Sequence, residues 1–407
     1  MKQKKSDNKL FFFADNIDIP FVRNEIENLS ERFDKVNVIT FTSSPTIQFK
    51  KNVSITSLNY NNYSTKQIFS KYFCQIAKLT MGELLKYPNY FLHIKLFRVQ
   101  VSRLCRCFYL YDCLKANDNI LDKRNICYTF WFNDWATVLS ILKSNADINE
   151  FYSRVHGADL FEERVPKTKR IAFRWFQLNE VAKVFSVSQK GANYLKEKYP
   201  DFAQKIYTGY LGTEDHFQGS GPTPNKFTIV TCAKIRNIKR IHLIPEILQH
   251  INFPLRWIHI GGEDKNDPTT KTLHKNLEKL KVSNKNIEID FYGNISNTEI
   301  FEVYNKNFVN LFISVSETEG LPVSMMEAIS FGIPILATNV GGCSEIVTPQ
   351  TGFLVPVNFK KEEVADIIIN EYNRSKFNKD ARSIIRQFWS KKFSAQKNID
   401  FLLAQFS

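Results

Sequence analysis

The sequence predicts an α/β protein with two doubly wound parallel sheets. Short apolar runs alternate with longer amphipathic segments, a pattern typical of buried parallel strands connected by helices. The alternation starts twice, at Leu10–Ala14 and again at Thr228–Cys232. Between the two series lies Gly212–Lys226, whose GSGPTP core predicts a linker. A chain of 407 residues with 43% hydrophobic content is long enough to bury two cores.

The expected domain limits follow from this alternation. The four parts are residues 1–212, a first α/β domain; 213–226, the linker; 227–379, a second α/β domain; and 380–407, an amphipathic C-terminal helix that carries Trp389 and Phe393. The first domain contains an insertion of unusual composition at about residues 63–116.

This insertion is expected to be helical, and it is rich in aromatic and basic residues. Within Tyr63–Ala116 the only acidic residues are Glu83 and Asp112. Interleaved cations and aromatic rings suit an anionic membrane surface, where lysine and arginine reach the headgroups and the rings are buried. Helices packed on a sheet with a solvated basic face explain the composition equally well.

The composition limits the protein's location and partners. A formal net charge of +14 favours polyanionic or membrane-surface partners. The seven cysteines show no paired metal-ligand spacing, and their odd number argues against a complete disulfide framework. The Leu10–Ala14 run is too short for a signal peptide, and no run approaches the length of a membrane span. We expect a cytoplasmic protein with reduced thiols, at most peripheral to a membrane.

The first half begins as a βαβ unit. Leu10–Ala14 and Val36–Phe41 are predicted strands, and between them Val22, Ile26 and Leu29 recur at helical spacing. The first strand-to-helix turn, residues 15–20, contains no glycine, so it lacks the fingerprint of a dinucleotide-binding turn.

A histidine closes a later strand of this half. The predicted strand Phe151–Val155 is followed directly by His156 and Gly157. Side chains at the carboxyl ends of parallel strands line the crevice where such sheets bind ligands. His156 is therefore a candidate site residue, although a lone histidine more often has a packing or hydrogen-bonding role.

The second half places cations where phosphate binds. The strand Thr228–Cys232 is followed by a basic turn that contains Lys234, Arg236 and Lys239. Clustered cations between a strand and a helix suit a phosphate group, and a solvated basic loop is the alternative. The next two strand exits, at Gly261 and at Asn294–Ile295, are expected near a nucleotide base.

The strongest site signal lies in Val309–Glu327. A predicted strand, Leu311–Val315, leads through a polar loop to a helix opened by Pro322, a residue suited to the first helical position. Gly320 lets the backbone approach a ligand, and the N–H groups of Leu321, Val323 and Ser324 would face an anion.

Two carboxylates flank this anion site. Glu319 precedes it, and Glu327 is the only charged residue between Gly320 and Pro334. A carboxylate inside an otherwise apolar helix needs hydrogen-bond donors, and the hydroxyl groups of a ribose or hexose supply them.

These motifs resemble a known enzyme family. Glu319 and Glu327 within EGLPVSMMEA, followed by Gly332, Pro334 and the run VGGCSE at 340–345, resemble the E-x7-E donor site of family 4 retaining glycosyltransferases. The resemblance implies a GT-B fold, in which two Rossmann-like domains face each other across a cleft and a C-terminal helix crosses back to the first. It implies transfer of a sugar from a UDP- or GDP-linked donor, which is a substrate and not a cofactor.

The resemblance also assigns residue roles. It makes Glu319 and His156 catalytic, with His156 hydrogen bonding the sugar while the leaving phosphate accepts the proton of the acceptor. Lys234 and Lys239 match the Arg/Lys pair that holds the donor diphosphate. Because lysine lacks the bidentate geometry of arginine, Arg236 is expected to supply it. No D-x-D triplet occurs in the chain, so no metal is expected.

The acceptor and the rival functions remain open at this point. Phe21–Ile26 and Arg154–Asp159 resemble segments of bacterial surface-polysaccharide assembly enzymes, which favours a lipid-linked oligosaccharide acceptor at the inner face of the cell membrane. The alternatives are a basic peripheral membrane or nucleic-acid binding protein without turnover, and a nucleotide-sugar epimerase of the same fold. The absence of a recognised nucleic-acid module argues against nucleic acid. The sequence does not identify the sugar, the base or the linkage.

Overall fold

The chain forms two compact units, each with its own sheet and core. The computed structural model describes residues 9–42, 48–58, 63–87, 94–116, 122–164, 172–219, 221–222, 226–264, 266–374 and 379–406. The first unit is Met1–Tyr210 together with Ile399–Ser407, and the second is Leu211–Asn398. Parts of the predicted linker and insertion, at 220, 223–225 and 88–93, lie outside the described residues, as does position 407.

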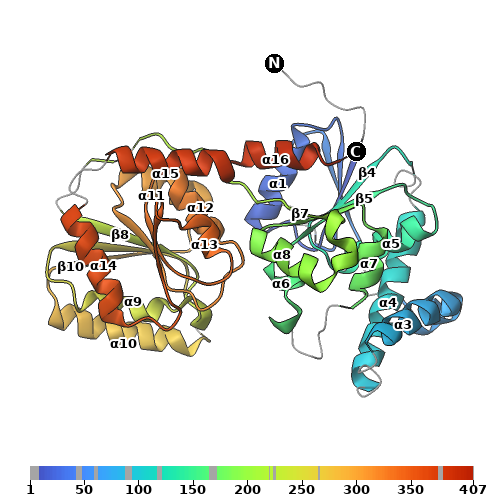
Figure 1. The fold of residues 1–407 in the computed structure, drawn as a ribbon, viewed down its shortest axis with the longest axis horizontal. Helices are drawn as coiled ribbons and strands as arrows, with labels where there is room; N and C mark the ends of the chain where they lie inside the picture. Colours follow the sequence, from blue (N-terminus) through green and yellow to red (C-terminus); the bar gives the residue numbers. More distant parts are fainter. Residues whose placement is uncertain are drawn as a thin grey trace. The chain divides into compact units, whose positions relative to one another are not determined.

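The first unit contains a seven-stranded sheet in which every paired strand is parallel (Figure 1). Its order is β3-β2-β1-β4-β5-β6-β7. The strands are β1 (Leu10–Ala14), β2 (Val36–Thr40), β3 (Val53–Ser57), β4 (Ile126–Thr129), β5 (Phe151–Val155), β6 (Lys183–Ser186) and β7 (Ile206–Thr208). The order reverses beside β1, so the predicted doubly wound arrangement is confirmed.

Helices cover this sheet, and the buried side chains of α1 have the spacing predicted from the sequence. They are α1 (Pro20–Ser30), α2 (Thr65–Lys71), α3 (Phe73–Lys86), α4 (Ile94–Lys115), α5 (Asp134–Ser144), α6 (Gly157–Leu160), α7 (Arg174–Glu180) and α8 (Gln189–Lys198). In α1 the predicted stripe of Val22, Ile26 and Leu29 is completely buried. All five residues of β1 are buried as well, which is the pattern of a central parallel strand.

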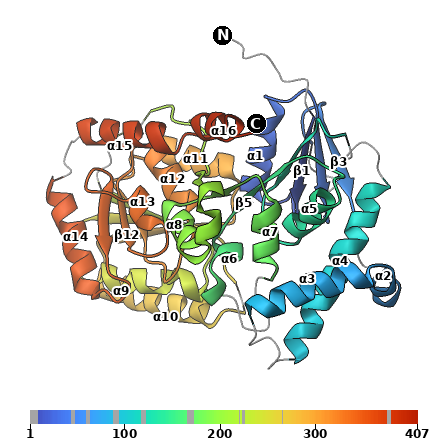
Figure 2. The same ribbon diagram turned by 45° about the vertical axis from the view of Figure 1, so that its right-hand side comes forward.

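The basic segment at 63–116 is helical and forms α2, α3 and α4. Both views show α3 and α4 beyond the edge of the sheet (Figures 1 and 2). Helix α4 is held to the sheet layer by Arg103 and Arg106, which both pair with Asp134 at the start of α5. Two of the cations in this basic segment therefore form ion pairs within the unit and are not free to bind an external partner.

A buried charged network joins the elements of the first unit. Arg154 of β5 is almost fully buried and donates from Nε to Glu25 of α1 at 3.2 Å and to the Tyr128 hydroxyl at 2.8 Å. It also donates to the carbonyl of Gly209, close to the end of the unit. Burial of such a charge is tolerated because each polar atom around it finds a partner.

The chain returns to the first unit at its C-terminal end, as predicted. Phe406 packs its ring against Tyr152 and Tyr128, with centroid distances of 4.6 and 5.8 Å. Lys183 donates to the carbonyl of Gln405 at 2.8 Å. Residues 399–406 therefore complete a layer of the first unit.

The second unit contains a six-stranded parallel sheet of order β10-β9-β8-β11-β12-β13. The strands are β8 (Phe227–Cys232), β9 (Leu255–Ile260), β10 (Ile287–Gly293), β11 (Leu311–Ser314), β12 (Ile335–Thr338) and β13 (Gly352–Val355). Its helices are α9 (Ile244–Leu248), α10 (Pro268–Ser283), α11 (Asn297–Lys306), α12 (Val323–Ser330), α13 (Cys343–Ile346), α14 (Lys361–Arg374) and α15 (Lys379–Lys392). This order is that of a Rossmann-type sheet, with its reversal between β8 and β11.

The prediction of one continuous helix at 380–406 is wrong. The segment forms α15 and a separate helix, α16 (Ala395–Leu403). At the break, Thr213 donates from its N–H to the carbonyl of Phe393 at 2.9 Å and accepts from the N–H of Ala395 at 3.0 Å. These bonds replace helical ones, so the start of the predicted linker is fixed to the break.

We predict that Arg154→Met lowers the free energy of unfolding by about 3–5 kcal/mol, because it leaves the Glu25 carboxylate buried without a cation. The additional change Glu25→Gln should recover part of this loss, since it removes the unpaired charge. Urea unfolding measures both effects. Arg32→Met, which breaks the more exposed pair with Asp400, is the matched control and should cost at most about 1 kcal/mol. Equal losses in the two single variants would show that the buried network is not special.

Candidate functional site

The candidate site of the second unit lies where the order of its sheet reverses. Strands β8 and β11 are neighbours there, and each leads into one of the predicted site loops. The loop after β8 carries Lys234, Arg236 and Lys239, and the loop after β11 carries Glu319 and Gly320. Helices that depart to opposite faces leave a crevice at such a point, where open α/β sheets bind ligands.

The basic loop after β8 is anchored by its own arginine. Arg240 adopts a left-handed backbone conformation, with φ of 51°. Its guanidinium donates to the carbonyl of Val315 at 2.6 Å and to that of Val357 at 2.9 Å. Because these bonds hold the loop against the end of β11, they place the neighbouring Lys239 at that end. Arg240 is not among the site residues predicted from the sequence.

The loop after β11 ends in a helix N-terminus without internal partners. Pro322 is the N-cap of α12 and not its first helical residue, which corrects the prediction. The difference arises because Pro322 has extended backbone angles, φ −74° and ψ 115°, and helical angles begin at Val323. In the described part of the chain, the N–H groups of Leu321, Val323 and Ser324 have no backbone acceptor. These free N–H groups are where the sequence predicts an anion site, and that site stays a prediction.

A glycine pair supports this loop from behind. The N–H of Gly342 donates to the carbonyl of Gly320 at 2.6 Å. At Gly341, which has φ of 55°, a Cβ atom would lie 2.0 Å from the carbonyl oxygen of Glu319. Any side chain at Gly341 would thus displace the backbone that presents Glu319.

Glu319 and Lys239 form the central ion pair of the site. Lys239 Nζ lies 2.6 Å from Glu319 Oε1, and only 10% of the Glu319 side chain is exposed. The thiol of Cys343 is close by, and burial together with the charge of Glu319 raises the pKa of Cys343 to about 12. The two loops after β8 and β11 therefore bring together residues that are far apart in the sequence.

Glu327 lies in the buried face of α12 and lacks such a cation. It is 7% exposed, and its carboxylate forms no hydrogen bond or ion pair with any residue that the structure describes. Burial raises the pKa of Glu327 to about 7. The sequence predicts that Glu327 takes its hydrogen-bond donors from a ligand. The lack of a partner within the described residues agrees with that prediction.

Two residues that the sequence did not reveal surround Glu327. Burial and the charge of Glu327 raise the pKa of Cys232, at the end of β8, to about 12. Burial, Cys232 and Glu327 together raise the pKa of Tyr304, on α11, well above its usual range. No sequence signal links Tyr304 to Glu327, because only the fold brings α11 beside α12.

The remaining predicted donor residues occupy the same edge of the sheet. Lys234 is exposed, and Arg236 Nε lies 3.7 Å from Asp264 Oδ2. A Cβ atom at Gly261 would lie 2.0 Å from the carbonyl oxygen of Ala233, so this glycine permits the close approach of two strand exits. The side chain of Asn294 accepts from the N–H of Gly262 at 2.9 Å, and Ile295 beside it is half-buried.

His156 closes β5 in the first unit, as predicted. Its Nε2 lies 3.0 Å from the carbonyl oxygen of Phe130, and its ring stacks on the Phe130 ring. Burial and the positive charge of Arg154 lower the pKa of His156 to about 3. The ring is therefore neutral near pH 7, and since a carbonyl only accepts, Nε2 carries the proton and Nδ1 is an acceptor.

An aspartate orients the His156 turn. Asp159 accepts from the N–H of His156 and from the N–H of Phe132, both at 2.6 Å. Burial raises the pKa of Asp159 to about 7, and the nearby charge of Arg174 opposes that rise. This carboxylate holds together the loops that follow β4 and β5.

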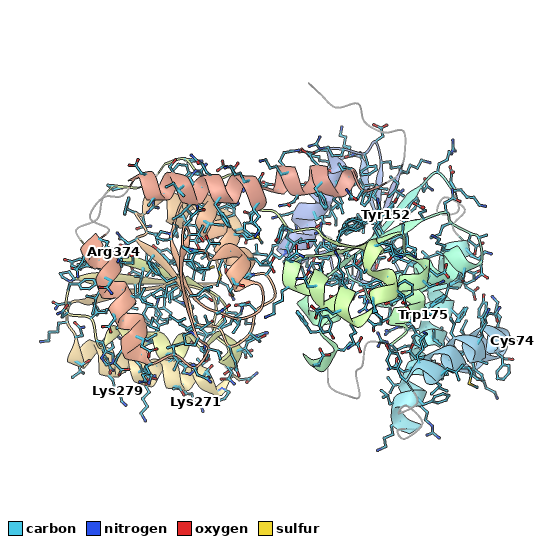
Figure 3. All side chains as sticks on the ribbon, viewed as in Figure 1. Cys74, Tyr152, Trp175, Lys271, Lys279 and Arg374 are labelled. Carbon is cyan, nitrogen blue, oxygen red and sulfur yellow. The ribbon has the colours of Figure 1, made fainter. Side chains whose placement is uncertain are left out.

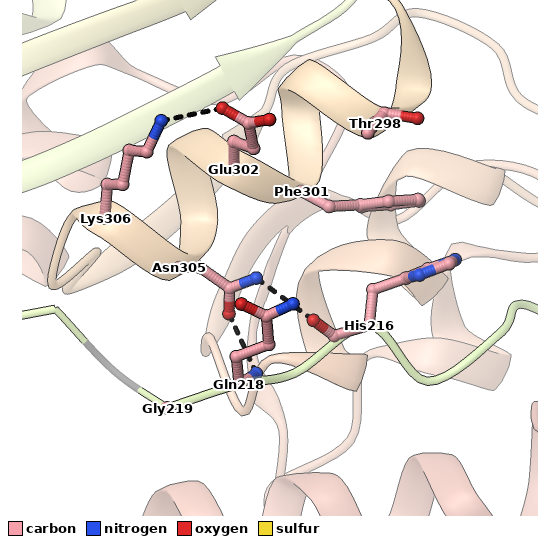
Figure 4. A pocket seen from close by; sticks show the side chains of 8 residues that line it. All are labelled: His216, Gln218, Gly219, Thr298, Phe301, Glu302, Asn305 and Lys306. Atoms are coloured by element: carbon pink, nitrogen blue, oxygen red, sulfur yellow. Dashed lines mark hydrogen bonds and ion pairs between the residues drawn. The ribbon is translucent and has the colours of Figure 1, made fainter.

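A separate cavity of about 640 Å³ lies on the second unit beside α11 (Figure 4). His216 stacks on Phe301 with a centroid distance of 4.3 Å, and Asn305 bonds to both the carbonyl of His216 and the N–H of Gln218. None of the predicted site residues lines this cavity. Among the described residues there is also no cluster of three or more His, Cys, Asp or Glu side chains that could hold a metal ion.

The site loops of the second unit lie in a segment that matches a known sequence family. Residues 212–388 match the family Glycosyl transferases group 1. This segment includes Lys239, Glu319 and Glu327. This match is to a broader family than the predicted family 4. It supports the predicted glycosyltransferase class, and family 4 membership stays a prediction.

Curated relatives point to the same class. An uncharacterized glycosyltransferase of Methanocaldococcus jannaschii is 25% identical over 295 residues, which cover 71% of this chain and 77% of that protein. The O-antigen biosynthesis glycosyltransferase WbnH of Escherichia coli is 28% identical over 148 residues, or 35% of this chain and 38% of that protein.

Solved structures confirm the fold. A glycosyltransferase of Rickettsia africae superimposes with a TM-score of 0.69 at 18% identity, covering 98% of both chains. HepE of Anabaena, solved in complex with UDP, gives a TM-score of 0.66 at 15% identity over 98% of this chain and 99% of that one. The predicted GT-B fold is confirmed by these similarities.

We predict that Glu327 makes the protein less stable as the pH rises. Its pKa is about 7 in the folded chain and lies near 4.5 when free, so the folded chain binds more protons between these values and loses stability as the pH increases through them. At about 1.4 kcal/mol per pH unit, the difference between Glu327→Gln and wild type should shift by about 3 kcal/mol in favour of the variant between pH 4 and pH 8.

Chemical denaturation at a series of pH values measures this shift. Glu317→Gln, at an exposed position before the same helix, is the matched control and should leave the pH dependence unchanged. If the free energies of unfolding of wild type and Glu327→Gln changed in parallel with pH, Glu327 would not be an ionisable carboxylate without a partner.

Proposed function

We propose that the protein is a retaining glycosyltransferase that moves a sugar from a UDP- or GDP-linked donor to an acceptor hydroxyl. The observation that carries this proposal is the Lys239–Glu319 ion pair at the unpaired N-terminus of α12. An anion site with one cation and one carboxylate can neutralise a diphosphate while it contacts the attached sugar. The group 1 match over residues 212–388 supports the same class.

Each donor residue has a distinct role in this proposal. Lys239 and Lys234 neutralise the diphosphate, together with the N–H groups of Leu321 and Val323, while Glu319 contacts the transferred sugar. Glu327 accepts hydrogen bonds from two hydroxyl groups of the ribose, which supply the donors that its buried carboxylate lacks. Gly261, Asn294 and Ile295 line the region of the base.

The reaction breaks the bond between the anomeric carbon and the phosphate oxygen and forms a bond from that carbon to the acceptor oxygen. The proton of the acceptor hydroxyl passes to the leaving phosphate, so no protein base is needed. His156 acts as a neutral hydrogen-bond partner of the sugar, because its pKa of about 3 excludes proton transfer through imidazolium near pH 7. No cofactor and no metal take part in this scheme.

The acceptor is proposed to be a lipid-linked oligosaccharide of bacterial surface polysaccharide synthesis. The resemblance of Phe21–Ile26 and Arg154–Asp159 to assembly enzymes supports it, as does the similarity to an O-antigen biosynthesis enzyme. We place the protein in the cytoplasm, in peripheral contact with an anionic membrane through the basic helices α2 to α4. Within the described residues, no helix combines the length and apolarity needed to span a bilayer.

Lys239→Met should weaken nucleoside diphosphate binding by about 1.5–3 kcal/mol, the range of charge-assisted hydrogen bonds, and should leave nucleoside binding almost unchanged. Calorimetry with UDP and uridine, or with GDP and guanosine, measures both affinities. Lys271→Met on the exposed face of α10 is the control and should change neither. If diphosphate and nucleoside weaken equally, Lys239 does not hold the phosphates.

His156→Ala should slow sugar transfer on the order of a hundredfold while nucleoside diphosphate affinity stays normal. Glu319→Gln should likewise lower kcat more than nucleotide affinity, because its partner is the reacting sugar. Donor turnover with an acceptor, compared with UDP or GDP affinity, separates the two effects. Wild-type turnover in folded His156→Ala would reduce His156 to a packing residue.

The first experiment is a thermal-shift screen of nucleotide sugars, followed by product analysis. Release of free nucleoside diphosphate with a glycosylated acceptor supports transfer. An epimerised nucleotide sugar without release indicates the epimerase alternative, and no stabilisation by any nucleotide sugar would support a binding protein without turnover.

A further inference from the structure

Helix α3 exposes a continuous apolar stripe. Phe73, Ala77, Met81 and Leu85 follow one another at four-residue spacing and therefore lie on one face of the helix. Phe73, Met81 and Leu85 are 55%, 54% and 79% exposed. The neighbouring face, with Ile76, Thr80 and Leu84, is buried against the unit, so the stripe itself is not needed for the core.

Two lysines that form no ion pair with any described residue run beside this stripe. Lys78 and Lys86 lie one helical position from the apolar residues, and both are exposed. Lys86 Nζ is 4.1 Å from the centre of the Trp175 ring. Lys71 and Lys115 of the same region are neutralised by Asp112 and Asp147. Three further cations, Lys66, Lys95 and Arg98, are exposed and, like Lys78 and Lys86, form no ion pair with any described residue. Positive charge without an ion-pair partner therefore borders the stripe and continues onto the neighbouring helices α2 and α4.

A cavity of about 640 Å³ opens beside the same residues. Trp175, Phe176 and Leu79 give it a mostly apolar wall, while Met81, Leu85 and both lysines belong to its lining. This volume lies within the range of small-molecule sites. The stripe and the cavity thus form one surface, which we call the α3 face.

Gly82 belongs to the lining of this cavity and faces open space. It lies inside α3, where glycine is an unfavourable helix residue. A Cβ atom at Gly82 would meet no atom within 4 Å, and the residue lines the cavity. A side chain introduced at Gly82 would therefore enter open space at the lining of the cavity.

The cavity is remote from the His156 edge of the sheet. Its lining includes Ser144 and Asn145, at the C-terminal end of α5, and Glu180, at the end of α7. Because α5 leaves the carboxyl end of β4 and returns toward the start of β5, these residues lie at the opposite edge. The occupant is therefore distinct from a sugar held near His156.

We propose that the α3 face docks on an anionic phospholipid bilayer, with one acyl chain of a phospholipid in the cavity and Lys78 and Lys86 facing its phosphate. Charge complementarity selects this occupant, because an apolar stripe bordered by unneutralised cations matches the boundary between acyl chains and anionic headgroups. The inference deepens the proposed membrane contact. It requires neither nucleotide nor sugar, so its failure would leave the proposed transferase reaction intact.

Vesicle flotation of the full chain tests the charge requirement. Wild type should bind phosphatidylcholine vesicles that contain phosphatidylglycerol at least about tenfold more strongly than vesicles of phosphatidylcholine alone. This expectation follows because each cation near an anionic surface contributes about 1 kcal/mol, or about fivefold in affinity. Lys78→Glu/Lys86→Glu should lose this binding. Lys271→Glu/Lys279→Glu, on exposed α10 positions (Figure 3), makes the same change in net charge and should bind like wild type. Equal losses in the two double variants, or equal binding of both vesicles, would overturn the proposal.

Blocking the cavity tests the acyl chain directly. Monomeric dihexanoyl phosphatidylglycerol should change the fluorescence of Trp175 in wild type and in Gly82→Ala, and Trp175→Phe should abolish the signal. Gly82→Trp should abolish lipid binding, whereas the small control Gly82→Ala retains it. If Gly82→Trp does not fold, Leu85→Glu at the cavity mouth gives the same test. A lipid response that persists in the blocked variants would show that the cavity takes no chain.

Cys74 gives an independent readout of docking. It is the exposed thiol of the seven cysteines, and it lies next to Phe73 on α3 (Figure 3). An environment-sensitive fluorophore at Cys74 should shift to shorter wavelength with anionic vesicles. An unshifted label on vesicle-bound protein would overturn docking through this face. Self-association without vesicles that is lost in Lys78→Glu/Lys86→Glu would assign the face to a second copy of the chain and also overturn the proposal.

Discussion

The buried guanidinium of Arg154 is the interaction on which the first unit depends. It connects α1 through Glu25, β4 through Tyr128 and the end of the unit through Gly209. Such a charge is tolerated only with complete hydrogen bonding, so these elements have little freedom to shift independently. The same charge acts on His156, two residues along the chain, and helps to keep its ring neutral. One side chain thus sets both the packing and the protonation state at this edge of the sheet.

The candidate site of the second unit shows the opposite arrangement, since one of its two carboxylates has no partner among the described residues. Glu319 has Lys239, but Glu327 is buried without a partner among the described residues, beside Tyr304 and Cys232. An unpartnered buried carboxylate costs stability, and hydroxyl donors placed beside it would remove that cost. Strain of this kind is typical of binding sites that are organised before the ligand arrives.

The sequence predicted the features that depend on local pattern. Buried strands such as β1 are continuous apolar runs, and the loop from Glu319 to Pro322 has a strand before it and a helix after it, so the site could be placed at a strand exit. The edge strand β3 was missed because its sequence, VSITS, is short and partly exposed. The break before α16 was missed because it depends on hydrogen bonds with Thr213, which is distant in sequence. Tyr304 and Arg240 were missed for the same reason, since tertiary contacts alone define their roles.

The position of Phe406 has a consequence for the order in which the protein is completed. Domains generally fold as they leave the ribosome, the N-terminal one first. Here the ring that covers Tyr152 and Tyr128 belongs to residues that are synthesised only after the entire second unit. Although the first unit is the first to be synthesised, its aromatic surface at Tyr152 and Tyr128 stays uncovered until residues 399–406 have been made. A fragment ending at Tyr210 would keep that surface exposed permanently, so the first unit is discontinuous in sequence and cannot be isolated by a single cut.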